Sequence, residues 1–183
     1  VRLDLSLAEQ FYSMAEFEVY GEGVPTKVSY VSTAIPLDEP VNFGEITYSF
    51  RPLRRDKQTD TLIDEEEGPA RLILETRSGT DDTPQAFFVV DDFGRDKEVT
   101  ETQWRRASLP RRESLTVRYP NQRSVVLDDK TNWSSWSSPY RSSGRLNRSP
   151  DGRQFLQFRA TFLTDDVQSI GRLDSLQFEV SPL

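Results

Sequence analysis

A strict two-residue alternation near the C-terminus, in the segment FLQFRATFL at residues 155–163, constrains the fold more than any other feature. The residues on one side of this pattern are apolar, and they are Leu156, Phe158, Ala160 and Phe162. The residues between them are polar. Because successive side chains of a β-strand point to opposite faces of its sheet, the pattern predicts a strand that buries one face.

Shorter stretches with similar strand patterns recur along the chain and are separated by Gly, Pro and Asp turn signals. We expect further strands at residues 16–20, 28–32, 45–50, 70–77, 85–90, 115–119, 124–127 and 176–180. A mild helical pattern is confined to residues 5–14. The sequence therefore predicts an all-β fold, an antiparallel sandwich of two sheets.

The length of 183 residues suits one large domain or two small ones. We expect residues 1–14 to form an arm or short helix leading into the domain, and residues 15–183 to form a single sandwich. The charged residues 52–69 show no usable period and are expected to form an exposed loop. Because the chain begins with Val1, we expect it to be a piece of a longer protein.

Composition excludes several classes of function. The chain has no Cys and no His, which removes thiolate nucleophiles, Cys-type zinc sites and every Ser-His or Cys-His catalytic pair. The net charge of −7 disfavours binding to nucleic acid and to anionic membranes. No apolar run approaches the roughly 18 residues that a membrane-spanning helix needs, so we expect no membrane insertion.

Two of the three tryptophans lie three residues apart in the string WSSWS at residues 133–137. This string resembles the Trp-Ser-x-Trp-Ser pattern of class I cytokine receptors, in which tryptophans and arginines interleave. That family places the pattern just before its last strand and has paired cysteines upstream. Here two strand patterns follow the string and the chain has no Cys, so the receptor interpretation is not favoured.

Two interpretations of the tryptophans stay open. In the first, one indole caps the end of the sandwich core and the other packs on an arginine stem. In the second, the indole faces form a platform for sugar rings, and neighbouring polar groups bind the hydroxyls. The candidate ligand-binding residues are Trp133, Trp136, Tyr140, Arg159 and Asn132. Burial of both indoles against arginines would exclude the sugar platform.

Four Asp-Asp pairs fall at predicted strand ends. Clustered carboxylates in loops suit Ca²⁺, which takes six to eight oxygen ligands. Asp also favours turns for its own backbone hydrogen bonds, which is a purely structural explanation. The candidate calcium ligands are Asp81, Asp82, Asp128 and Asp129.

Catalysis is the least favoured function. Glu75 and Glu179 lie on predicted polar strand faces, where two carboxylates could cleave a glycoside if they converged. Nothing in the sequence places them together. We therefore expect that the protein is not an enzyme.

The C-terminal third supports a more specific resemblance. SPDGR at residues 149–153, the FLQFRATF segment and LDSLQFEV at residues 173–180 follow the tryptophan string. This arrangement resembles jelly-roll, galactose-binding-like or carbohydrate-module-like domains of large bacterial secreted and surface proteins, over residues 130–181. The resemblance implies a jelly-roll sandwich, a secreted or cell-surface location, and a role as a glycan-binding accessory module. The alternative is a purely structural domain that contacts neighbouring domains of the parent protein.

Overall fold

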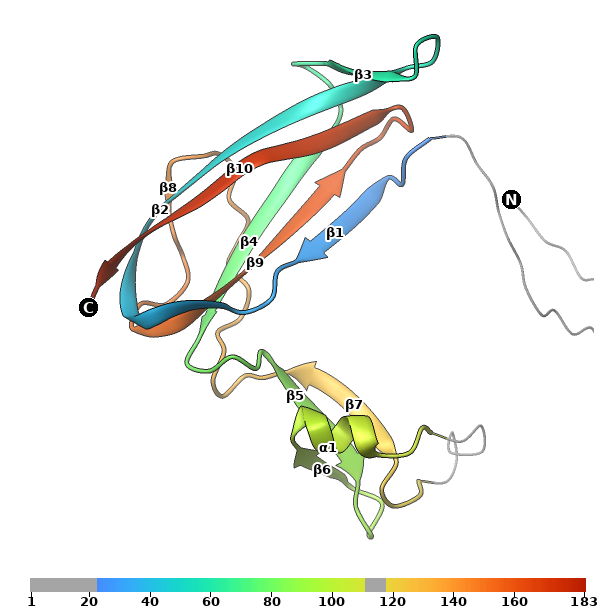
Figure 1. Cartoon of the computed structure of the whole chain (residues 1–183), viewed down its shortest axis with the longest axis vertical. Helices are drawn as coiled ribbons and strands as arrows, with labels where there is room; N and C mark the ends of the chain where they lie inside the picture. Colours follow the sequence, from blue (N-terminus) through green and yellow to red (C-terminus); the bar gives the residue numbers. More distant parts are fainter. Residues whose placement is uncertain (1–22, 111–117) are drawn as a thin grey trace, which may run out of the picture.

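The computed structural model describes residues 23–110 and 118–183, and it shows an all-β protein with two antiparallel sheets (Figure 1). The strands are β1 (Lys27–Val31), β2 (Ile35–Asp56), β3 (Thr61–Asp64), β4 (Arg71–Gly79), β5 (Gln85–Val90), β6 (Asp96–Val99), β7 (Arg123–Asp128), β8 (Arg145–Leu146), β9 (Arg153–Leu163) and β10 (Ser169–Pro182). One helix is present in this part of the chain, α1 (Glu101–Arg106). The arm at 1–14, the strand at 16–20 and most of the one at 115–119 are predictions outside the described residues.

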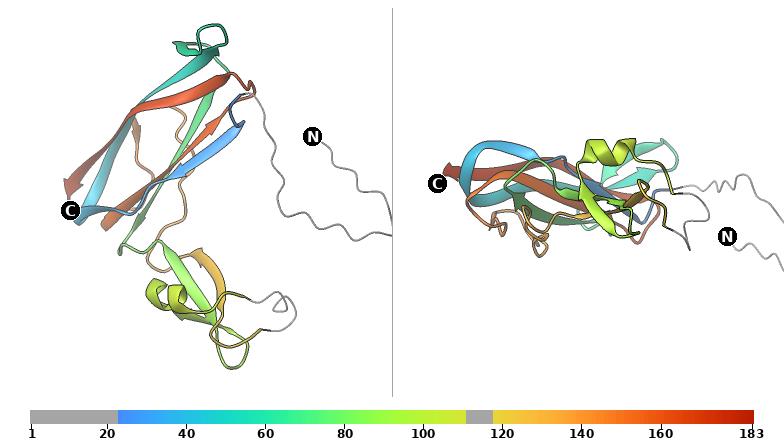
Figure 2. Two further views of the ribbon diagram at one scale, coloured as in Figure 1. Left: turned by 45° about the vertical axis from the view of Figure 1, so that its right-hand side comes forward. Right: turned by 90° about the horizontal axis from the view of Figure 1, so that it is seen from below.

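The larger sheet has seven strands and bends over itself into two facing layers (Figure 2). One layer contains β4, β9 and β1, and the other contains β2 with β10, β3 and β8. Strand β2 belongs to both layers, because Ile35 and Pro36 pair with β9 and the residues from Val41 onward pair with β10. Asp38, at φ +59°, lies at this corner, where the pairing with β9 is interrupted. The prediction of an all-β sandwich is confirmed.

The main core lies between the two layers. Its most buried members are Ile46 from β2, Leu74 from β4 and Ala160 from β9, together with Tyr140. Burial of such side chains supplies the main favourable free energy of folding. The alternation at residues 155–163 therefore predicted the correct inner face, although Phe158 and Phe162 remain only partly buried.

Residues 85–128 contain the second sheet, of order β6-β5-β7, which forms no ladder with the larger one. Helix α1 packs against one face of this sheet, where the rings of Trp104 and Phe87 lie 5.6 Å apart. This small unit projects from one end of the sandwich (Figure 1). Within the described residues no helix is long and apolar enough to cross a membrane.

Two local expectations were wrong. The segment 52–69 contains the end of β2 and all of β3, which pair as a hairpin, although most of its residues are exposed as expected. Helix α1 was not expected, yet Thr100 and Gln103 form a complete capping box at its start. The spacing Thr-x-x-Gln is a recognised start signal, but a six-residue helix is too short to show a helical period.

Candidate functional site: a tryptophan–arginine ladder beside a polar hollow

Residues 132–140 run antiparallel along the edge of β4 that β9 leaves free. The N–H of every third residue donates to the carbonyl of every second β4 residue: Ser134 to Ser78 (2.9 Å), Ser137 to Thr76 (2.8 Å) and Tyr140 to Leu74 (2.9 Å). Three residues of this segment, which we call the edge segment, thus span two residues of the strand.

The serines of WSSWS have a specific place in this pairing. The hydroxyl of Ser134 accepts a hydrogen bond from the N–H of Ser78, and that of Ser137 accepts one from the N–H of Thr76, both at 3.1 Å. In a regular sheet a backbone carbonyl would fill this role. Serine side chains therefore satisfy strand N–H groups that would otherwise be buried without an acceptor.

The tryptophans of the edge segment stack with arginines of the outer sheet face. The guanidinium carbon of Arg77 lies 5.4 Å from the ring centroid of Trp133 and 4.4 Å from that of Trp136. That of Arg159 lies 4.6 Å from the Trp136 centroid. These four side chains form a ladder in the order Trp133, Arg77, Trp136, Arg159. Each contact is a cation–π interaction of about 0.5–2 kcal/mol, the higher value applying where water is excluded.

Side chains from β4, β9 and the small unit's β7 bind the polar edges of the ladder's arginines. Arg77 donates to Gln157 at 2.7 Å and forms an ion pair with Asp128 at 2.9 Å. Arg159 forms an ion pair with Glu75 at 2.7 Å. These bonds fix the plane of each guanidinium, which a stacked geometry requires.

Gly79 permits the close approach of Trp133 to β4. A Cβ at this position would lie 2.3 Å from an indole carbon of Trp133. The indole N–H donates to Asp81 at 3.0 Å, and the side chain is only 3% exposed. The absence of a side chain at Gly79 is therefore a requirement of the ladder.

Most of the predicted ligand-binding residues lie close together in the structure. Their side chains, however, contact other residues of the protein. Trp133 is buried, and Trp136, which is half-buried, carries two guanidinium groups. Tyr140 lies in the core, where its hydroxyl bonds to Thr76 at 2.7 Å. Two free, coplanar indole faces, the geometry that the sugar platform requires, are therefore not present in the described structure.

The predicted calcium ligands likewise have other partners. Asp81 accepts from Trp133, and Asp128 pairs with Arg77. Asp82 is exposed and accepts from the Thr83 hydroxyl. Within residues 23–110 and 118–183, no group of three or more acidic residues is arranged to hold a metal ion. Calcium binding stays a prediction.

Asp129 caps the turn that begins the edge segment. Its carboxylate accepts the N–H groups of Thr131 at 2.7 Å and Asn132 at 3.1 Å, and the amide of Asn132 at 3.0 Å. Burial acts to raise the pKa of Asp129, but these hydrogen bonds outweigh it and lower the pKa below its usual value. The residue is therefore held as an ionised cap.

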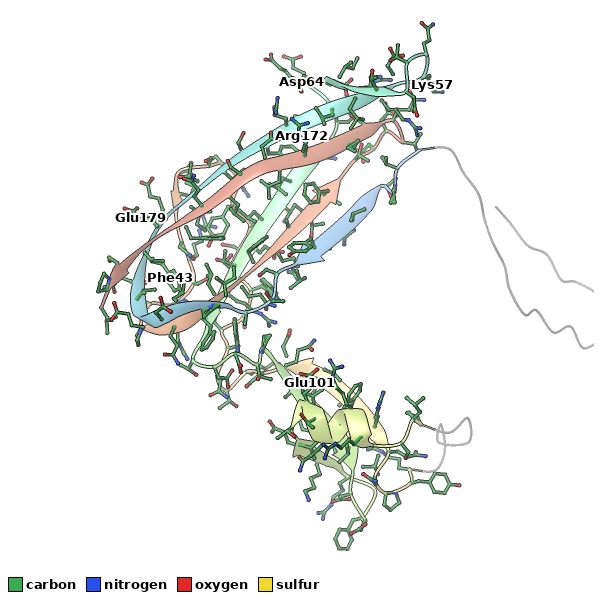
Figure 3. All side chains as sticks on the ribbon, in the orientation of Figure 1. Phe43, Lys57, Asp64, Glu101, Arg172 and Glu179 are labelled. Atoms are coloured by element: carbon green, nitrogen blue, oxygen red, sulfur yellow. The ribbon has the colours of Figure 1, made fainter. Side chains whose placement is uncertain are left out.

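The two carboxylates considered for glycoside cleavage lie in different layers. Glu75 is on β4 and is paired with Arg159. Glu179 is on β10 (Figure 3), and its carboxylate accepts the N–H of Glu45 at 3.1 Å. The structure does not bring the two groups together.

An open hollow of about 560 Å³ lies where the small unit joins the sandwich. Most of its lining residues are polar, and they include Asp81, Thr83, Gln85, Glu98, Glu101, Gln103, Asp129 and Asn132; Ala86, Phe87 and Val99 complete the lining. Figure 3 shows Glu101 on α1, in the small unit. Among the described residues, the side chains of Gln85 and Glu98 form no hydrogen bond or ion pair. We call this the junction hollow.

Sequence reasoning identified three residues of the junction hollow, Asp81, Asp129 and Asn132, but it missed the remainder. Gln85 and Glu98 lie on β5 and β6, and no motif marks their positions. The pairing of β5 with β6 places these side chains near the turns that contain Asp81 and Asp129. Comparisons with known protein families, with curated proteins and with solved structures find no match for this chain.

Proposed function

We propose that this chain is a non-catalytic accessory module of a larger exported protein, and that it binds a neutral glycan in the junction hollow. The observation that carries the proposal is the lining of the hollow, where carboxylates and amides converge and two of them, Gln85 and Glu98, have no other side-chain partner among the described residues. The resemblance of residues 130–181 to bacterial surface modules supports a jelly-roll, galactose-binding-like sandwich and a secreted or cell-surface location.

The chemistry of the hollow favours hydroxyl-rich ligands. Sugar hydroxyls both donate and accept hydrogen bonds, so they match carboxylate acceptors and amide groups that do both. Four carboxylates, from Asp81, Glu98, Glu101 and Asp129, line the hollow. Their charge disfavours sulfated, phosphorylated or uronic ligands, because like charges repel.

The ladder fits this function as a support for the hollow. Asp81 and Asn132 line the hollow and also hold the edge segment in place. Asp81 accepts the indole N–H of Trp133, and the Asn132 carbonyl accepts the N–H of Thr80 at 3.0 Å. A rigid wall reduces the entropy lost on binding.

The test is binding to an array of neutral glycans, followed by titration of any ligand found. Gln85→Ala and Glu98→Gln should each weaken binding by about tenfold, the effect of one lost hydrogen bond to a polar group. The matched controls, Gln177→Ala and Glu39→Gln, change exposed residues outside the hollow and should alter affinity less than about twofold. Equal effects in both pairs of variants would contradict the site.

A second candidate function is a structural spacer without a small-molecule ligand. The ladder favours the spacer function, because Trp133 and Trp136 both stack on arginines of this chain. The array separates the two candidates: a spacer binds no glycan, with or without Ca²⁺. Thermal unfolding in EDTA tests the calcium prediction, since removal of a bound ion should lower the melting temperature.

A further inference from the structure

The arginines of residues 141–148, which we call the arginine segment, differ from most others in the described part of the chain. Most of the described arginines form ion pairs with carboxylates, as Arg51 does with Asp64. Arg141, Arg145 and Arg148 are exposed, and within residues 23–110 and 118–183 they form no ion pair. They therefore make a basic patch on a chain whose net charge is −7.

Backbone hydrogen bonds hold the arginine segment across one side of the sandwich. Just before it, Tyr140 donates its N–H to a carbonyl of β4 at 2.9 Å. The N–H groups of Gly144 and Asn147 donate to carbonyls of β2, those of Ile46 at 2.9 Å and Gly44 at 2.8 Å. The segment therefore passes from one layer to the other, and β8 within it pairs with β2 (Figure 1).

Neutral groups orient two of these guanidiniums. The Nε of Arg145 donates to the Ser142 hydroxyl at 3.0 Å. Arg148 donates to the Ser138 hydroxyl at 2.5 Å, and its guanidinium carbon lies 5.6 Å from the ring centroid of Tyr140. Because none of these partners is charged, both guanidiniums are held in place without being neutralised. Each keeps further N–H donors, in a planar arrangement that suits a carboxylate.

An exposed apolar side chain lies among the arginines. Leu146, on β8, is 69% exposed and stands between Arg145 and Arg148 in the sequence. Protein interfaces are enriched in Arg and combine it with apolar side chains. A nucleic acid or a sulfated polysaccharide would use the charges but would leave Leu146 without a partner. The patch therefore favours a protein segment that carries carboxylates beside apolar residues.

Residues 62–67 of the same chain, which we call the acidic segment, have this complementary chemistry. Leu62 and Ile63 on β3 are 49% and 50% exposed, and a run of four acidic residues follows them. Glu66 and Glu67 in this run are exposed and have no hydrogen-bond or ion-pair partner among the described residues. Figure 3 shows Asp64 at the end of the sandwich that lies away from the small unit.

A hollow of about 230 Å³ adjoins the acidic segment, and Phe50, Pro52 and Glu66 are among its lining residues. An arginine side chain combines an apolar stem with a charged head. Phe50 and Pro52 suit the stem, and the carboxylate of Glu66 suits the guanidinium. The hollow thus has the chemistry to receive an arginine from another molecule.

Both segments lie along one edge of β2. Strand β8 pairs with β2 at Glu45 and Ile46, and β3 pairs with it from Leu53 onward, while β10 occupies the other edge at both places (Figure 1). From Ile46 to Leu53 the strand spans roughly 23 Å, at about 3.3 Å per residue. The two segments of one molecule are therefore too far apart to pair with each other.

We propose that two copies of this chain associate through this side, with the arginine segment of each on the acidic segment of the other. A two-fold axis through the middle of the β2 edge forms both contacts at once, because it exchanges the two ends of the edge. The net charge of −7 on each copy opposes association. At physiological salt, however, repulsion between exposed charges more than about 8 Å apart is largely screened. We therefore expect a weak dimer that forms at high protein concentration.

Disulfide trapping tests this contact directly, because the chain has no native Cys. Full chains carrying Leu146→Cys, mixed with full chains carrying Leu62→Cys, should form the mixed disulfide-linked dimer in excess over either homodimer under mild oxidation, since the two positions lie close together only across the contact. The control mixture, Leu146→Cys with Gln177→Cys on β10, should show no such excess. Equal yields of the mixed dimer in the two mixtures would overturn the proposal.

Charge reversal gives an independent measurement by analytical ultracentrifugation. The parent chain should form dimers, and no larger species, as its concentration rises. A variant with Arg141→Glu and Arg145→Glu should dimerise about tenfold more weakly or less still. Mixing it with a second variant, Glu66→Arg with Glu67→Arg, should restore association, because each contact then joins opposite charges again.

The matched control is Arg71→Glu with Arg105→Glu, which makes the same change in net charge at exposed positions outside both segments. It should alter the dimer affinity less than about twofold. The proposal is overturned by a parent chain that stays monomeric at every concentration, by species larger than a dimer, or by equal weakening in the control.

Discussion

Both units of the protein stack an arginine on a tryptophan, but the arginine has a different role in each. In the sandwich, Arg77 is 4% exposed and lies between two indoles, with its polar edge bonded to Gln157 and Asp128. In the small unit, Arg123 lies 4.6 Å from the Trp104 centroid. Its guanidinium donates to the carbonyls of Trp104 at 3.1 Å and Arg105 at 2.5 Å, at the end of α1.

The two stacks also differ in what lies beneath them. Below the ladder is a core whose Leu74 and Ile46 are almost fully buried. The small unit has three strands, one short helix and a few less deeply buried residues such as Phe87 and Val89. The stack of Arg123 on Trp104 therefore forms a large part of the core of the small unit. The ladder, in contrast, adds to a sandwich whose core already lies between its two layers. So small a unit is marginally stable by itself.

The largest effects are expected from the same substitution in each unit. Trp133→Ala should destabilise the whole sandwich by about 3–5 kcal/mol, the usual cost of removing a buried aromatic side chain. Trp104→Ala should instead unfold residues 85–128 and leave the sandwich folded. Hydrogen exchange measured by residue distinguishes the two results. Loss of protection in β9 and β5 together in Trp104→Ala would show that the units are one cooperative body.

Lysine in place of each arginine gives an intermediate effect. Arg77→Lys keeps the charge but loses the planar stack and its side-chain hydrogen bonds, so we expect a loss of about 1–3 kcal/mol in the free energy of unfolding. Arg123→Lys should cost about 1 kcal/mol or less, because an ammonium can still bind carbonyls at a helix C-terminus. Denaturant titration measures both. A larger loss for Arg123→Lys would reverse the proposed roles.

Acidification should have the smallest effect, and it should act on both units. Hydrogen bonds from Ser169 and Arg54 lower the pKa of Glu65 in the sandwich, and those from Ser124 and Arg118 lower the pKa of Asp96 in the small unit. A carboxylate with a lowered folded-state pKa stabilises the protein above its unfolded-state pKa, and this contribution is lost as pH falls through the folded-state value. Melting temperature should therefore drop below about pH 4.5.

Variants assign this pH dependence to the two carboxylates. Near neutral pH, Glu65→Gln and Asp96→Asn should each have a lower melting temperature than the parent chain. On acidification, the melting temperature of each variant should fall by less than that of the parent chain. The control is Asp82→Asn, since Asp82 is exposed and its carboxylate accepts from the hydroxyl of the adjacent Thr83. An identical acid response in all variants would contradict the assignment.

Sequence patterns predicted the strands in which apolar and polar residues alternate or form a short apolar run. Residues 85–90 were predicted as a strand with the bounds that β5 has, and β9 and β10 extend beyond their predicted cores. The second sheet of β5, β6 and β7 was not predicted as a separate unit. Alternation shows which face a strand buries, but it does not show which neighbour the strand selects.

The candidate site was only partly predictable for the same reason. The sequence placed Trp133 and Trp136 near an arginine, and Arg159 is one partner of Trp136. It did not identify Arg77, which is distant in the sequence and reaches the tryptophans only because the edge segment lies along β4. Asp81 and Asp82 follow β4, and Asp128 and Asp129 lie at the end of β7, as their predicted positions at strand ends required. The contacts of Asp81 with Trp133 and of Asp128 with Arg77 were not predictable, because they depend on the long-range position of the edge segment.

The pairing of the edge segment with β4 has a consequence for self-association. A strand edge repeats every two residues, and an added strand must match that repeat along its whole length. The edge segment advances three residues for every two of β4, so the surface it presents outward has a different spacing. A second molecule therefore cannot extend the sheet at this edge. The unequal count ends the growth of the sheet on the side of β4, because an added strand would not match the repeat of the edge segment.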